Sequence, residues 1–202
     1  MTSPASPSPR YLQNRTPSPW VVRFAPLVRA GGAVLDVAAG GGRHARHFLS
    51  RGHPVTALDR AVAALEDLDG AEVVQADLED GTPWPLAGRR FAAVVVVNYL
   101  HRPLLGALLA ALEPGGVLIY ESFAAGNETF RRVRDTGHLL HAGELLDWAA
   151  GRLQVVAYEH GIEARQPQPC VVQRLCAVND LDPSARADGQ PLPHPLAGGD
   201  CG

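Results

Sequence analysis

The chain has 202 residues, 46% of them hydrophobic and 19% charged, with a formal net charge of −3 at pH 7. This size fits one domain that buries a core without disulfide or metal cross-links, and the slight acidity offers no electrostatic footprint for nucleic acid. Three cysteines without metal-ligand spacing, and no apolar run of signal-peptide or membrane length, predict a cytoplasmic protein that does not enter membranes.

Both ends of the chain have compositions that disfavour a packed fold. Residues 1–19 repeat Ser-Pro pairs, and residues 179–202 are rich in proline and glycine. Such segments bury too little apolar surface to offset the entropy lost on ordering. The sequence therefore predicts a disordered leader at 1–19, one domain at 20–178 and a disordered tail at 179–202.

Short apolar runs alternate with helical patterns from residue 20 to residue 122. The alternation is typical of a parallel sheet with helices on both faces. Four consecutive valines at 94–97 suit a central strand that is buried on both sides. The predicted strands are 33–37, 54–58, 71–75, 91–97 and 116–122, and the predicted helices are roughly 20–30, 42–51, 60–67 and 103–112.

The pattern changes after residue 123. A loop-rich insert at 124–141 precedes a short predicted helix at about 143–150. Two further apolar runs, 153–159 and 170–178, read as a closing antiparallel pair. The predicted fold class is therefore α/β, with a doubly wound, mostly parallel, Rossmann-like sheet.

The strongest functional signal is the segment Ala33-Val-Leu-Asp-Val-Ala-Ala-Gly-Gly-Gly-Arg-His-Ala45. Its three glycines, including Gly40 and Gly42, carry no Cβ, so a ligand can approach the backbone closely. The helix predicted after them presents unpaired N–H groups to the anionic end of a nucleotide-like cofactor. The match to G-x-G-x-x-G/A also fits a nicotinamide or flavin cofactor, so the turn alone leaves the cofactor open.

Three aspartates at predicted strand ends favour S-adenosylmethionine. Asp36 lies inside the first strand, where it would repel a pyrophosphate but tolerate an ammonium or sulfonium group. Asp59 ends the second strand and can accept ribose hydroxyls, with Arg60 beside the adenine. Asp77 follows the third strand and can accept a hydrogen bond from the adenine amino group, while the N–H of Leu78 points toward the adenine ring. Each acid alone is more typical of a helix cap or a solvated loop, but the three together at matching strand ends indicate one site.

On these residues the chain resembles the class I S-adenosylmethionine-dependent methyltransferases over roughly residues 20–178. The resemblance rests on residues 34–42, on Asp59 and Asp77, and on Leu112-Glu-Pro-Gly-Gly-Val-Leu118. It implies a seven-stranded sheet whose last strand runs antiparallel.

Two details refine this resemblance. Ala38 stands where family members often have glycine, which narrows the space around the methionine end of the cofactor. Gly42-Arg43, the helix start at Gly143-Glu144-Leu145 and the short final hairpin are most similar to the small bacterial group of tellurite-resistance and thiol methyltransferases.

The resemblance implies methyl transfer from S-adenosylmethionine to a small-molecule acceptor, with the reacting methyl beyond the fourth strand. Asn98 is then expected to contact the methionine end of the cofactor, and Arg43 to pair with its carboxylate. Tyr99 and His101 are expected to orient the acceptor or take its proton, since histidine titrates nearest neutrality. Equally simple interpretations make Tyr99 a core residue, His101 a loop cap and Arg43 an exposed arginine.

Two other functions stay open at this point. One is an NAD(P)-dependent oxidoreductase, and the other is a non-catalytic S-adenosylmethionine-binding scaffold without an acceptor cavity beside residues 98–101. His44 and His47 lie three apart on one predicted helix face, but with no further ligand in view the sequence predicts no metal. The predicted partner is a small molecule rather than a nucleic acid.

Overall fold

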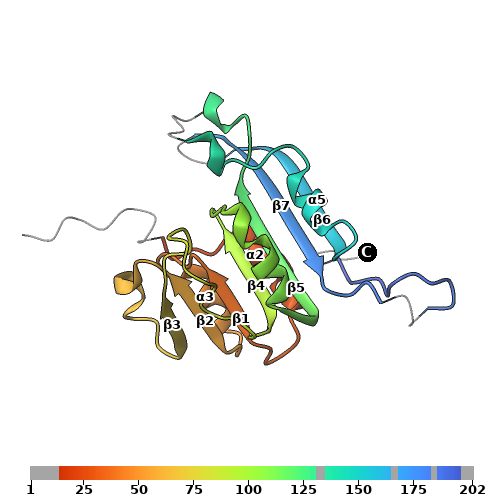
Figure 1. The fold of residues 1–202 in the computed structure, drawn as a ribbon, viewed down its shortest axis with the longest axis horizontal. Coiled ribbons are helices and arrows are strands. Elements are labelled where there is room, and N and C mark those ends of the chain that lie inside the picture. The colour runs from red at the N-terminus through yellow and green to blue at the C-terminus, as the bar shows by residue number, and fades with distance from the viewer. Residues whose placement is uncertain (1–13, 131–134, 165–167, 183–185, 197–202) are drawn as a thin grey trace, which may run out of the picture.

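The computed structural model describes residues 14–130, 135–164, 168–182 and 186–196. Within these ranges, seven strands form one sheet in the order β3-β2-β1-β4-β5-β7-β6 (Figure 1). β1 to β5 pair in parallel, and β7 runs antiparallel to both β5 and β6. The predicted sheet with its antiparallel last strand is confirmed. The strands are β1 (Val34–Val37), β2 (Val55–Asp59), β3 (Ala71–Gln75), β4 (Phe91–Val97), β5 (Leu112–Phe123), β6 (Gln154–Glu163) and β7 (Cys170–Val178).

Short helices cover both faces of the sheet. On one face lie α2 (Pro19–Phe24), η1 (Ala25–Leu27), α3 (Arg43–Leu49) and η2 (Val62–Leu65), and on the other lie α4 (Leu105–Ala110) and α5 (Glu144–Ala149). Three single turns, η3 (Arg102–Leu104), η4 (Asn127–Thr129) and η5 (Thr136–His138), belong to the connections.

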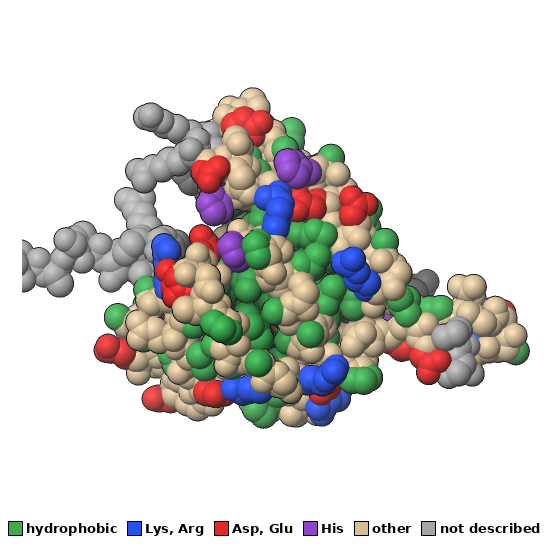
Figure 2. Space-filling view, viewed as in Figure 1, with side chains coloured by type: hydrophobic (Ala, Val, Ile, Leu, Met, Phe, Trp, Pro, Cys, Tyr) green, Lys and Arg blue, Asp and Glu red, His purple; other side chains and the backbone are tan. Residues whose placement is uncertain are grey.

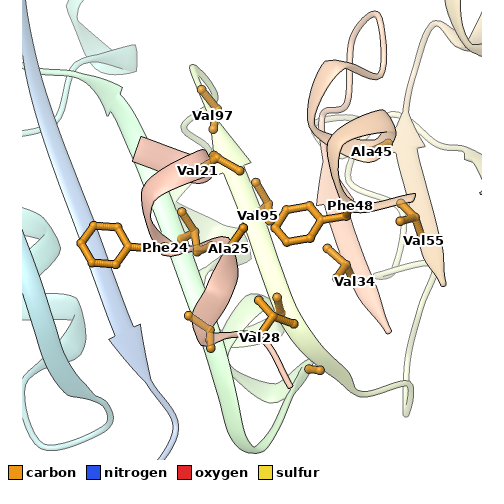
Figure 3. Packing of buried hydrophobic residues seen from close by; sticks show 14 of the residues in the cluster. Val21, Phe24, Ala25, Val28, Val34, Ala45, Phe48, Val55, Val95 and Val97 are labelled. Carbon is orange, nitrogen blue, oxygen red and sulfur yellow. The ribbon is translucent and has the colours of Figure 1, made fainter. Parts of the chain in front are cut away.

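The core consists of two layers separated by the sheet. On the first face, Val95 and Val97 of β4 belong to the same cluster as Phe24 of α2 and Phe48 of α3 (Figure 3). Val94 and Val96 point to the opposite layer with the second group of helices. Because successive side chains of a strand alternate between faces, the four valines contribute to both layers, as their continuous apolar run predicts.

The helices of the second face are too short to cover it completely. Leu104, Leu109 and Trp148 pack against the core there and remain half-buried. Figure 2 shows hydrophobic side chains in the middle of this face, with many of the charged ones toward its rim. Among the described residues, no helix has the length and apolar character that crossing a membrane requires.

Several predicted boundaries differ from the structure. The helix predicted at 103–112 ends at Ala110, because Leu112 already pairs with Phe91 at the start of β5. The register then shifts, and Gly116 is needed there, since a Cβ would lie 2.9 Å from the Phe91 carbonyl oxygen. The helix predicted at 60–67 is only the 3₁₀ turn η2, and β6 runs four residues further than predicted, to Glu163.

Both predicted disordered ends contain residues that belong to the described fold. Ser18 is buried and caps α2 by accepting a hydrogen bond from the Trp20 N–H, with Pro19 at the first helical position. At the other end, Asn179 exchanges backbone hydrogen bonds of 2.8 Å with Gly115 and Gly116. Residues 1–13 of the predicted leader lie outside the described residues.

Candidate cofactor-binding site

The carboxyl ends of the parallel strands meet at one edge of the sheet. β1 lies between β2 and β4. The chain adds β2 and β3 on one side of β1 and then crosses to the other side to form β4, so the strand order reverses at β1. Open α/β sheets bind ligands at such a switch point. A cavity of about 730 Å³ lies at this edge, within the 300–1,000 Å³ that small-molecule sites usually have.

Nine of the twelve predicted site residues line this cavity. They follow the ends of β1, β2, β3 and β4 or begin α3, so the sheet brings together side chains that are far apart in the sequence. The nine are Ala38, Gly40, Arg43, Asp59, Arg60, Asp77, Leu78, Asn98 and Tyr99.

Two carboxylates hold the glycine turn at 40–42 and the first turn of α3 that follows it. Asp59 Oδ2 accepts a hydrogen bond of 2.8 Å from the Gly40 N–H. Asp36 Oδ2, in the fully buried strand β1, accepts one of 3.0 Å from the N–H of Ala45 in the first turn of α3. Backbone donors of this kind are the ones that bind phosphate at a glycine turn. Here they are bound to anionic side chains, which would repel a diphosphate.

Two non-glycine residues beside the cavity have a left-handed backbone. Ala38, directly after β1, has φ +52°, and Asn98, directly after β4, has φ +59°. Asparagine adopts this conformation readily, whereas alanine is strained in it. Such strain tends to gather at ligand sites. At Ala38 it arises because a side chain stands in a position that suits glycine.

Tyr99 lines the cavity, and its hydroxyl group is buried. Burial, followed by the negative charges of Glu79 and Asp77, raises the pKa of Tyr99 above its usual value. The buried hydroxyl lies beside the Glu79 carboxylate but makes no hydrogen bond of standard geometry among the described residues. Because it stays protonated at neutral pH, it does not serve as a base.

Three predicted site residues lie outside the cavity lining. Asp36 is 1% exposed, and its carboxylate holds the start of α3 from inside rather than facing a ligand. Gly42 has φ +72°, and a Cβ there would lie 2.8 Å from Cδ2 of Leu65, so core packing explains this glycine. His101 is half-buried at the start of η3, where its carbonyl accepts a hydrogen bond from the Leu104 N–H.

Sequence reasoning missed five polar or aromatic residues of the lining. His44 was considered only as a metal ligand, and its Nδ1 lies 3.8 Å from Asp36 Oδ1 in the interior. Across the described residues, no three histidine, cysteine or acidic side chains converge as a metal site. The five missed residues are Asn14, His44, Glu79, Phe123 and His138.

His138 reaches the cavity from the insert after β5. Arg102 donates to the carbonyls of Gly137 and Leu139, the two neighbours of His138, at 2.5 and 2.9 Å. The same guanidinium pairs with both carboxylate oxygens of Glu144 at 2.7 and 2.9 Å. The place of His138 in the lining depends on these contacts between residues far apart in the sequence, so local sequence patterns contain no signal for it.

The sequence matches no protein-family model and no curated protein. Solved structures of similar fold include TehB from Haemophilus influenzae, with a TM-score of 0.66 at 13% identity over 79% of this chain and 61% of TehB. Burkholderia thailandensis 1,6-didemethyltoxoflavin-N1-methyltransferase, solved with 1,6-didemethyltoxoflavin and S-adenosylhomocysteine, has a TM-score of 0.57 at 22% identity over 79% of this chain and 76% of its own.

A third similar structure is the N-methyltransferase NodS from Bradyrhizobium japonicum WM9 with S-adenosylhomocysteine. Its TM-score is 0.55 at 17% identity, over 83% of this chain and 95% of NodS. The chain therefore has the fold of the class I S-adenosylmethionine-dependent methyltransferases, as the sequence resemblance predicts. It spans about 61% of the length of TehB.

Proposed function

We propose that the protein binds S-adenosylmethionine and transfers its methyl group to a small-molecule acceptor. The observation that carries this proposal is the pair of carboxylates, Asp36 and Asp59, bound to the backbone N–H groups of the glycine turn and the first turn of α3. They oppose a diphosphate and are compatible with a cofactor whose charged centres include a sulfonium and an ammonium. The methyltransferase structures of similar fold support the same cofactor.

Different residues of the lining suit different parts of the cofactor. Asp59 keeps acceptor capacity beyond its two backbone hydrogen bonds, which suits ribose hydroxyls. Asp77 and Leu78 suit the adenine, and Arg43 suits the methionine carboxylate. When bound, S-adenosylmethionine supplies a methyl group activated by the adjacent positive sulfur.

The acceptor is proposed to lie beyond Asn98, between Tyr99, Phe123 and His138. Holding an acceptor in its reactive orientation is worth about 7–11 kcal/mol, whereas a general base contributes about 10²–10⁴-fold. Tyr99 lines this space, and its protonated hydroxyl fits an orienting role rather than that of a base. This space beside Asn98 favours an enzyme over a scaffold that only binds the cofactor. His101 lies outside the lining, so we do not propose it as a residue that orients the acceptor or takes its proton.

Calorimetric titration of the full-length protein tests the cofactor. S-adenosylmethionine and S-adenosylhomocysteine should both bind, and NADH and NADPH, followed by nucleotide fluorescence, should not. Binding of a nicotinamide nucleotide without binding of S-adenosylhomocysteine would instead support the oxidoreductase. Formation of S-adenosylhomocysteine with a panel of thiols, tellurite, small amines and phenols then tests catalysis, and a binding-competent protein that turns over none of them supports the scaffold.

A further inference from the structure

The residues just before α2 lie across the glycine turn. Arg15 Nη1 donates a hydrogen bond of 2.8 Å to the Gly41 carbonyl, and Arg43 Nη1 donates one of 3.2 Å to the Thr16 carbonyl. Asn14 lines the cavity together with Gly41 and Arg43. This segment therefore adds a wall to the cavity at the end where α3 begins.

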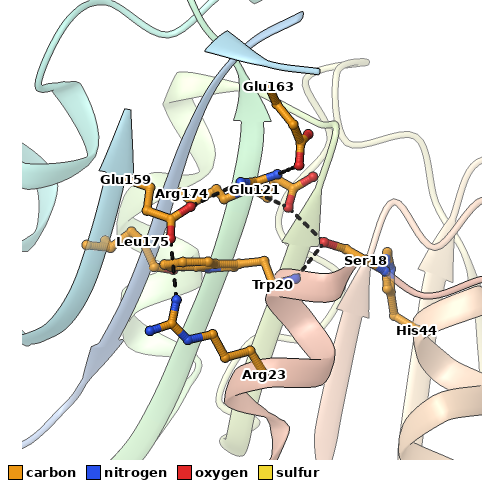
Figure 4. Close-up of polar contacts among 9 residues, drawn as sticks. All are labelled: Ser18, Trp20, Arg23, His44, Glu121, Glu159, Glu163, Arg174 and Leu175. Atoms are coloured by element: carbon orange, nitrogen blue, oxygen red, sulfur yellow. Dashed lines mark hydrogen bonds and ion pairs between the residues drawn. The ribbon is translucent and has the colours of Figure 1, made fainter. Parts of the chain in front are cut away.

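One end of the segment is fixed in the interior by Ser18. Its hydroxyl donates to Glu121 Oε2 at 2.7 Å, and its backbone N–H donates to His44 Nε2 at 3.3 Å (Figure 4). Glu121 is itself buried and pairs with Arg174 at 3.0 Å. Moving Ser18 would leave buried polar groups without partners, which is costly. Ser18 therefore stays in place while the fold is intact.

The other end is held by contacts that are more exposed than those of Ser18. Arg15 Nη2 pairs with Asp67 Oδ2 at 3.0 Å, and these two side chains are 47% and 63% exposed. Exposed ion pairs contribute little stability and are screened by salt. Pro17, with its restricted backbone, separates this end from Ser18. The contacts of Arg15 can therefore break while the anchor at Ser18 remains.

We propose that residues 14–18 form a strap that completes the cofactor site and must release at Arg15 for the cofactor to exchange. Arg15 acts as a positioning residue, because it holds the Gly41 carbonyl and the strap rather than the ligand. The proposal rests on the proposed function for the identity of the ligand, S-adenosylmethionine or its product.

Limited trypsin digestion of the full-length protein tests the strap, because the chain contains no lysine and trypsin cuts only after arginine. Cleavage between Arg15 and Thr16 requires the Arg15 side chain to leave its partners. A ligand that binds only the closed strap lowers the open population by a factor of 1 + [L]/Kd. S-adenosylhomocysteine at 100 times its Kd should therefore slow this cleavage about 100-fold. Mass spectrometry should show an unchanged rate after the exposed Arg186, which serves as an internal control.

A variant pair tests the same point kinetically. Arg15→Ala should raise the dissociation rate of S-adenosylhomocysteine, measured by stopped-flow displacement, about tenfold. Arg29→Ala removes an exposed arginine that pairs with Glu113 away from the cavity, and should leave this rate unchanged. Unfolding midpoints of both variants should stay close to that of the natural protein, which separates a role in exchange from a role in stability.

The outcomes are distinguishable. If calorimetry shows that S-adenosylhomocysteine binds, but cleavage at Arg15 is equally fast with and without it, the strap is overturned and the proposed function stands. A dissociation rate of Arg15→Ala equal to that of Arg29→Ala overturns the strap in the same way. If the natural protein does not bind S-adenosylhomocysteine at all, the proposed function fails, and the strap fails with it.

Discussion

The carboxylate of Asp59 joins two backbone turns. One oxygen accepts a hydrogen bond from the Gly40 N–H and the other from the Ala61 N–H, both at 2.8 Å. The last residue of β2 thus braces the glycine turn that follows β1, and its side chain also lines the cavity. A single acid therefore couples the shape of the turn to any ligand that the cavity holds.

Asp59→Ala should weaken binding of S-adenosylhomocysteine tenfold or more. Hydrogen bonds to a charged group are worth about 1.5–3 kcal/mol each, and tenfold corresponds to about 1.4 kcal/mol. Calorimetry measures the affinity, and circular dichroism checks that the variant is folded. Asp69→Ala, at an exposed acid outside the lining, is the control. An unchanged Kd in Asp59→Ala would exclude Asp59 from the ribose site.

Ala38→Gly should stabilise the protein, unlike most substitutions to glycine. A left-handed backbone costs a non-glycine residue about 1–2 kcal/mol, and glycine adds up to about 1 kcal/mol of unfolded-state entropy. The free energy of unfolding in urea should therefore rise by up to about 1 kcal/mol. The neighbouring Ala39 is buried and has no positive φ, so Ala39→Gly should instead lower stability by about 1 kcal/mol. Destabilisation by both changes would contradict strain at Ala38.

Gly42→Ala should be more damaging than Gly52→Ala. Both glycines have positive φ, but a Cβ at Gly42 would lie 2.8 Å from the buried Leu65, whereas a Cβ at Gly52 meets no atom within 4 Å. Overpacking typically costs about 1–3 kcal/mol, so the two variants should differ by about that amount in urea unfolding. Leu65→Ala alone and in combination with each glycine variant completes two double-mutant cycles. Equal costs for the two glycine substitutions would show that only backbone strain matters.

Glu144→Gln should change how stability depends on pH. Burial would raise the pKa of Glu144, but hydrogen bonds from Arg102 and from the His141 N–H, with the charge of Arg102, bring this pKa below its usual value. A carboxyl with a lowered pKa stabilises the fold above its unfolded pKa of about 4.3, and this stability is lost as the pH falls through the folded pKa. The natural protein should therefore exceed the variant by up to about 1 kcal/mol at pH 7.

Urea unfolding at pH 7, 5 and 3.5 measures this difference between the natural protein and Glu144→Gln. The gap should narrow at the lowest pH, because the Glu144 carboxyl is then protonated for more of the time, whereas glutamine is neutral throughout. Glu66→Gln, at an exposed position, provides the comparison for a general effect of removing a surface charge. A gap that stays constant from pH 7 to pH 3.5 would show that Glu144 acts through shape rather than charge.

The strands and the edge that carries the site are readable in the amino-acid sequence. A continuous apolar run such as 91–97 indicates a strand that is buried on both faces, so the residues of the strand themselves predict its burial. Glycines and acids placed directly after such runs meet at one edge because parallel strands all end there. For that reason Asp59, Asp77 and Asn98 were found from local patterns and line one cavity.

Tertiary contacts settled what local patterns do not contain. Ser18 lies in a segment whose composition predicts disorder, yet its hydroxyl bonds to Glu121, 103 residues away. The sequence predicts that Asp36 faces a ligand, but its carboxylate instead accepts a hydrogen bond from the N–H of Ala45 inside the fold. His138 lines the cavity, and Arg102 holds the carbonyls on either side of it. A hydrogen bond between distant residues depends on both partners and on the packing between them, so neither residue signals it alone.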